Sequence, residues 1–291
     1  MGLTAATSVE DGVAANAARQ SLIGDGYCIL KNIADRSLLD ELTVVTGGLL
    51  DGVCEKDKDL FRYQGSNIFV AYQHPVFARL FALPAALDAL TALGFPRPKW
   101  LSAYLLSKPA FGPPLYWHQD WAAWDAPDSA AIAPPQLFLM YYLTDTCREN
   151  GCLRVIPGTH RKRIALHGQL PIAHSDASYK APLESPGFCR HPDEIEVPMR
   201  AGDLVVGDAR VLHAAHPNRT AQRRTCLTLW YAPDFENLSE PVQAWMARKE
   251  PIAPPNWWEG EAGAAVEPLI PRYTGNAQPS KWTRAPGAYL L

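Results

Sequence analysis

The sequence predicts a mainly β fold with flanking α-helices, in which the strands form an antiparallel barrel or jelly roll. Short apolar segments with strand character recur from Lys99 onward, and turns rich in Gly and Pro separate them. Helical segments do not alternate with these strands. A parallel sheet needs a crossover between neighbouring strands, usually a helix, so the pattern argues against one.

The first third of the chain is expected to support the barrel with helices. Residues 1–12 should form a loose tail, and Tyr27–Lys31 a first strand. Asp35 is a suitable N-cap for the helix that follows it. Helices are expected at Ala14–Ile23, Ser37–Leu50 and Pro75–Leu93, the last interrupted at Pro84.

The later strands flank a long irregular interval. It runs from Arg161 to Glu196 with several prolines and little periodicity, which is typical of a lid or binding loop. Strands are expected at Trp100–Ser107, Leu115–Trp121, Gln136–Thr144, Cys152–Ile156, Glu194–Val197, Asp203–Gly207, Ala209–His213 and Arg224–Tyr231.

We expect one domain over residues 1–291. After the tail, residues 13–98 should form the helical support and first strand, and residues 99–235 the barrel, with residues 161–196 as its lid. Residues 236–291, which contain Trp257, Trp258 and Trp282, are expected to fold back across the barrel.

Composition excludes several classes of protein. A net charge of −3 provides no basic footprint for nucleic acid, and no apolar run approaches the roughly 20 residues that span a bilayer. Residues 1–12 lack the basic start and apolar centre of a secretory signal. The six cysteines form no Cys-x-x-Cys pair, which favours free thiols. We therefore expect a cytoplasmic protein with a small-molecule partner, and its oligomeric state is left open.

His118 and Asp120 form a candidate metal site. In an extended strand, residues two apart point to the same face, so these side chains should project together, with Tyr116 beside them. One imidazole and one carboxylate provide two ligands of the facial triad that non-haem Fe(II) oxygenases use. The two other His-x-Asp pairs, His174/Asp176 and His191/Asp193, lie in polar, proline-flanked segments and are interpreted as exposed loop.

A third ligand should be a histidine on another strand. His213 ends an apolar segment and is the preferred candidate over His216, which lies in a turn-like sequence. Arg224 follows at the head of the next strand, and its guanidinium could bind a carboxylate in two-pronged fashion inside the barrel. Arg223 would then point outward.

These pieces together resemble the phytanoyl-CoA dioxygenase family of Fe(II)/2-oxoglutarate-dependent oxygenases, whose fold is a double-stranded β-helix, a cupin-like jelly roll. The resemblance rests on His118-Gln-Asp120, the run NGCLRVIPGTH from Asn150 to His160, Gly202–Val206, and His213 followed by Asn218 and Arg224. It covers roughly residues 20 to 235.

The resemblance implies that His118, Asp120 and His213 hold Fe(II). It also implies that Arg224 binds the distal carboxylate of the co-substrate 2-oxoglutarate, with Lys108 near that co-substrate, and that O2 is the oxidant. Related halogenases replace the carboxylate ligand by a small residue. The presence of Asp120 therefore favours hydroxylation, with succinate and CO2 released, and desaturation, cyclisation or endoperoxidation are alternative outcomes.

Two other functions stay open at this level. A cupin-like metalloenzyme that does not use 2-oxoglutarate would keep the triad without needing Arg224, and a non-catalytic barrel would serve as a binding module. The substrate is also open. The basic side chains of residues 161–196 indicate either an anionic substrate or a solvated surface without a role in binding. Five aromatic residues could line an apolar pocket or belong to the core: Trp117, Trp121, Trp124, Tyr141 and Tyr142.

Overall fold

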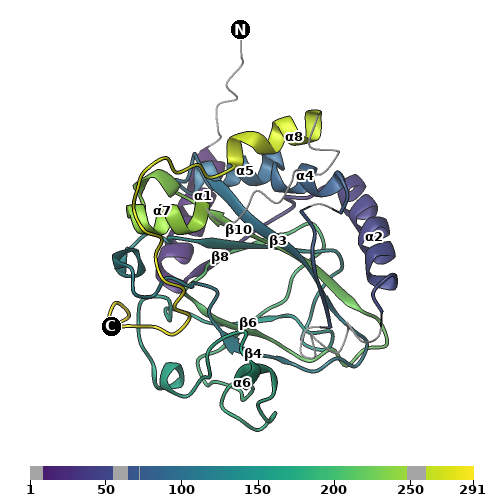
Figure 1. Cartoon of the computed structure of the whole chain (residues 1–291). Coiled ribbons are helices and arrows are strands. Elements are labelled where there is room, and N and C mark those ends of the chain that lie inside the picture. Colours follow the sequence, from purple (N-terminus) through teal and green to yellow (C-terminus); the bar gives the residue numbers. More distant parts are fainter. Residues whose placement is uncertain (1–8, 55–64, 72, 248–259) are drawn as a thin grey trace.

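Two antiparallel sheets face each other in the computed structural model, which describes residues 9–54, 65–71, 73–247 and 260–291 (Figure 1). The larger sheet has the order β1 (Tyr27–Leu30), β8 (Leu204–Asp208), β5 (Leu137–Tyr142), β10 (Arg224–Ala232), β3 (Lys99–Lys108) and β2 (Ser66–Phe69). The smaller has the order β4 (Leu115–His118), β9 (Leu212–Ala215), β6 (Leu153–Ile156) and β7 (Ile195–Val197). The predicted antiparallel jelly roll with flanking helices is confirmed.

Helices cover the outer face of the larger sheet. In Figure 1, α4 (Val76–Phe81), α5 (Pro84–Ala92) and α8 (Glu261–Val266) lie along that face. Phe81 stacks on Trp100 of β3, with ring centroids 4.4 Å apart. The remaining helices are α1 (Val9–Asp25), α2 (Arg36–Asp51), α6 (Asp176–Tyr179) and α7 (Glu240–Ala247). None of the described helices is long and apolar enough to cross a membrane.

Local signals placed α2 and the two helices on either side of the Pro84 break closely. The Asp35 carboxylate accepts the backbone N–H of Leu38 and caps α2, and Pro84 occupies the first turn of α5, where its missing N–H costs nothing. The predicted tail is helical from Val9 onward, and residues 1–8 lie outside the described part of the chain. Trp257 and Trp258 also lie outside it.

Two predicted strands are wrong at the ends that meet. β4 stops at His118 instead of reaching Trp121, and β9 begins only at Leu212. The carbonyl of Ala209 accepts the backbone N–H groups of Asp120 (2.8 Å) and Trp121 (2.9 Å). Both predicted strands would have used these backbone groups for pairing within a sheet. The groups instead connect the turn before β9 to the segment after β4.

A buried ion pair fixes this turn. Arg210 is fully buried, and its Nη2 lies 2.6 Å from Oδ2 of Asp208. The same guanidinium donates to the carbonyls of Ser129 and Ala131. Asp208 and Arg210 therefore hold the turn whose Ala209 carbonyl anchors Asp120.

Replacing Asp208 by alanine is expected to lower the free energy of unfolding by roughly 3–5 kcal/mol, because it leaves a buried guanidinium without its carboxylate. Urea denaturation of the two proteins measures this. Asp51→Ala, which removes the exposed partner of Arg223, is the control and should cost about 1 kcal/mol or less. Equal costs for the two variants would contradict the assignment.

Candidate metal centre

His118 and His213 are direct cross-strand partners in the pair β4–β9. Each ring places Nδ1 against a backbone carbonyl, that of Tyr116 at 3.0 Å and that of Val211 at 3.1 Å. A carbonyl only accepts hydrogen bonds, so Nδ1 carries the proton in both rings. The lone pair is therefore on Nε2 in each case, the state in which an imidazole binds a metal.

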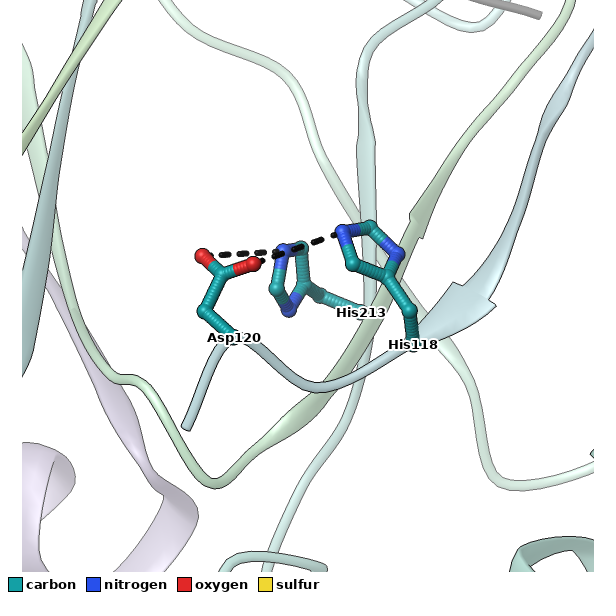
Figure 2. A group of neighbouring side chains, drawn as sticks. All are labelled: His118, Asp120 and His213. Carbon is teal, nitrogen blue, oxygen red and sulfur yellow. Dashed lines mark ion pairs between the residues drawn. The ribbon is translucent and has the colours of Figure 1, made fainter. Parts of the chain in front are cut away.

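Asp120 completes the group from the segment beyond β4 (Figure 2). Its Oδ1 lies 3.6 Å from Nε2 of His118, and its Oδ2 lies 3.8 Å from Nε2 of His213. Trp230 of β10 donates its indole N–H to Oδ2 at 2.9 Å. The donor atoms of the three residues lie within 4.8 Å of one another. Two neutral imidazoles and one carboxylate make a donor set that fits a divalent transition-metal ion.

Burial controls the charge states of this group. It lowers the pKa of His118 well below the ordinary value and also lowers the pKa of His213. Burial alone would raise the pKa of Asp120, but the surrounding imidazoles outweigh it and hold that pKa below its ordinary value. At neutral pH the three side chains are therefore in the protonation states that a metal ion requires.

The metal-free protein is expected to lose stability as the pH falls below about 6.5, the ordinary pKa of histidine. The unfolded chain then binds protons that the buried rings of His118 and His213 do not take up, so acid favours unfolding. Urea unfolding in chelator at about pH 7.5 and about pH 5.5 measures the difference. Identical unfolding free energies at the two pH values would rule out neutral buried rings.

The triad opens onto a cavity of about 700 Å³ between the two sheets. Arg224 lines it, is 7 % exposed and faces the ring of Tyr142 at 5.4 Å. Its Nε has no hydrogen-bond partner, and no carboxylate of the described residues pairs with its guanidinium. Arg223 points the other way and is half-exposed, as predicted, and it pairs with Asp51. A buried guanidinium that pairs with none of the described carboxylates has the charge and the donor geometry to bind an anion at this end of the cavity.

Lys108 is the register partner of Arg224 in the pair β3–β10 and lines the same cavity. Its ammonium donates to the carbonyl of Pro113 at 2.6 Å. Burial and the nearby Arg224 lower its pKa well below the ordinary value. Gly151 has φ of +93°, and a Cβ there would lie 2.9 Å from the Lys108 side chain. This turn therefore needs glycine, because a larger residue would collide with the Lys108 side chain.

The three His-x-Asp pairs do not divide as predicted. His191 and Asp193 lie 3.9 Å apart outside the cavity, with Asp193 exposed and His191 partly buried. His174 is not in an exposed loop but lines the cavity, and its ring centroid lies 5.0 Å from that of His118. That part of the prediction is wrong because the segment 161–196 folds back over β4, which its polar sequence did not indicate. His216 lies apart from the triad, with Nε2 3.1 Å from Glu196.

Other cavity residues were missed. Trp230 shares a face with Arg224, Cys226 and Thr228 along β10, so the two-residue period of a strand could have placed it in the cavity. Trp282 and Arg284 come from the C-terminal segment, where no sequence pattern marked them. Of the five aromatic residues considered for the pocket, Tyr142 lines the cavity, while Trp117, Trp121, Trp124 and Tyr141 are buried in the core.

Comparisons with known proteins agree with this architecture. Residues 24–226 match the phytanoyl-CoA dioxygenase (PhyH) family. The ectoine dioxygenase of Bordetella parapertussis is 26% identical over 269 residues, which cover 86% of this chain and 84% of that protein.

Solved structures show the same fold. The iron-bound crystal structure of EctD from S. alaskensis superposes with a TM-score of 0.57 at 23% identity, covering 82% of this chain and 81% of that one. The epimerase SnoN, solved with Fe3+, α-ketoglutarate and nogalamycin RO, gives a TM-score of 0.56 at 20% identity and covers 76% of this chain and 84% of that one. The family match extends over most of the sequence and includes all three residues of the triad. The chain therefore belongs to the phytanoyl-CoA dioxygenase family of iron- and 2-oxoglutarate-dependent oxygenases.

Proposed function

We propose that this protein hydroxylates a small organic molecule, with Fe(II) held by His118, Asp120 and His213 and with 2-oxoglutarate as co-substrate. The observation that carries the proposal is the buried Arg224, which lies in the same cavity as the triad and pairs with no carboxylate of the described residues. Its planar guanidinium suits the distal carboxylate of 2-oxoglutarate. Lys108 beside it adds a second basic group at that end.

The protein's own part is positioning. When bound, iron and 2-oxoglutarate supply the oxidising chemistry, in which O2 oxidises 2-oxoglutarate to succinate and CO2 and a C–H bond of the substrate becomes C–OH. The Nδ1 hydrogen bonds of His118 and His213 fix which ring nitrogen faces the site, and Trp230 holds the carboxylate of Asp120. Apolar and aromatic walls, including Tyr142, limit water in the cavity.

Charge in the cavity favours an anionic or neutral substrate. Among the described residues that line it, Asp120 is the single acidic one and is committed to the metal, whereas Lys108, Arg224 and Arg284 are basic. Of the basic side chains in the segment 161–196, His174 lines the cavity, whereas the arginines and lysines do not. Arg163, for example, donates to the carbonyls of Leu290 and Pro286 instead. Arg284 forms no ion pair with a described residue and lies over the ring of Trp282. We assign it to an anionic group of the substrate.

Replacing Arg284 by glutamine is expected to raise the substrate KM roughly 10- to 100-fold, the loss of a charged hydrogen bond, without changing the KM for 2-oxoglutarate. Arg272→Gln, which removes an exposed arginine of the same C-terminal segment, is the matched control. Succinate release across a panel of matched carboxylates and amides measures both constants. An unchanged preference for carboxylates in Arg284→Gln would contradict the assignment.

Succinate release tests the function itself. The proposal predicts that substrate, Fe(II), O2 and 2-oxoglutarate together yield one succinate for each hydroxylated product. A cupin-like metalloenzyme would convert substrate without consuming 2-oxoglutarate, and a binding module would do neither. The epimerase SnoN has the same fold, so mass analysis of the product separates hydroxylation from other outcomes.

A further inference from the structure

His174 lies at the metal centre although it is not one of the three ligands. It belongs to the segment between β6 and β7, in the turn that leads into α6. Its Nε2 lies 3.9 Å from Oδ1 of Asp120, and its side chain is 28% exposed, toward the cavity that it lines.

Two bonds to one hydroxyl hold His174 in this place. The Tyr116 hydroxyl lies 2.9 Å from Nδ1 of His174 and also accepts the backbone N–H of His174 at 3.1 Å. His174 has φ of +58°, a left-handed conformation that costs a residue with a side chain roughly 1 kcal/mol or more. Tyr116 lies on β4, two residues before His118. The strand β4 thus supplies His118 to the triad and also, through Tyr116, holds the imidazole of His174 beside Asp120.

The carboxylate of Asp120 is therefore approached from two sides. Trp230 donates to Oδ2, whereas Oδ1 lies 3.6 Å from Nε2 of His118 and 3.9 Å from Nε2 of His174. Each carboxylate oxygen has two lone pairs, so it can accept a hydrogen bond and still face a metal ion. Closing the gap from 3.9 Å to a hydrogen bond of about 2.9 Å needs a shift of roughly 1 Å.

We propose that His174 is a positioning residue, which orients the Asp120 carboxylate for the metal through Oδ1 while Trp230 holds Oδ2. The inference rests on the proposed function, because it assumes that Asp120 is a metal ligand. Hydrogen-bond partners that orient a ligand typically affect metal affinity 10- to 100-fold. The role of His174 can therefore be measured as a change in metal affinity, without any catalytic turnover.

The test is anaerobic titration of the metal-free, full-length protein with Co(II), without 2-oxoglutarate, following Kd and the visible Co(II) spectrum. His174→Ala is expected to weaken binding about 10-fold and to alter the spectrum. His174→Gln, whose amide nitrogen can reach the position of Nε2, should bind within about threefold of the wild type. His191→Ala, from the same segment but outside the cavity, should match the wild type.

Wild-type Kd and spectrum in His174→Ala would overturn this inference alone. A loss that glutamine does not restore, or one that follows a fall in thermal stability in both variants, would overturn it as well, since it would reveal packing instead of orientation. Absence of Co(II) binding by the wild-type protein would overturn the proposed function, and this inference with it.

Discussion

Replacing Asp120 by alanine is expected to lower succinate production by about three orders of magnitude or more, the scale on which losing one member of a catalytic unit acts. The change removes the single anionic ligand of the triad and leaves His118 and His213 to bind the metal as two neutral rings. It also removes the acceptor of the Trp230 indole N–H. Single-turnover assays at saturating Fe(II) measure the chemical step.

The matched control for this change is Asp193→Ala. Asp193 follows a histidine with the same spacing, but its side chain is exposed and lies outside the cavity, so succinate production should stay within about twofold. If Asp120→Ala retained a tenth or more of the wild-type rate while remaining folded, the carboxylate would not be a metal ligand. If both variants lost activity, the loss in Asp120→Ala could not be assigned to the metal site.

Replacing Arg224 by methionine is expected to raise the KM for 2-oxoglutarate by roughly 30-fold or more, since truncating one partner of a buried charge pair costs about 2–5 kcal/mol. Methionine preserves much of the side-chain volume beside Tyr142, so the loss is that of charge and two-pronged hydrogen bonding. Lysine at this position should restore only part of the affinity. The KM comes from succinate release at varied 2-oxoglutarate concentration.

Arg223→Met is the neighbouring control. Arg223 is half-exposed and its partner is Asp51 at the end of α2, so the KM for 2-oxoglutarate should not change. A normal KM in Arg224→Met would contradict the assignment of this arginine to the co-substrate. The triad would then favour a metalloenzyme that does not use 2-oxoglutarate.

The sequence predicted the sheet class because strand signals are local. Alternating or continuous apolar residues marked β3, β5 and β10 closely, and the Asp35 cap and Pro84 break marked the helices. β2 was missed, since its four residues carry no clear pattern. The ends of β4 and β9 were wrong because Ala209 accepts hydrogen bonds from the segment after β4, a long-range contact that no local pattern encodes.

The site residues likewise include some that local sequence patterns indicated and some that depend on long-range packing. His118 and Asp120 are two residues apart, and Arg224 follows His213 by eleven residues at the head of the next strand. The sequence therefore indicated all four as candidate site residues. His174 and Arg284 reach the cavity from segments without regular periodicity. Their placement depends on how those segments pack on the finished barrel, and the Tyr116 hydroxyl that holds His174 gave no signal in the sequence.

The most direct test of a joint iron and 2-oxoglutarate site is an anaerobic titration of the protein with Fe(II) followed by 2-oxoglutarate. Joint binding of both at one centre predicts a weak visible charge-transfer band that appears only when both are present. The band should vanish in Asp120→Ala, and in Arg224→Met it should need a higher concentration of 2-oxoglutarate. A wild-type protein that shows no band, or a band that survives in Asp120→Ala, would contradict the claim that this triad and this arginine form one iron and 2-oxoglutarate site.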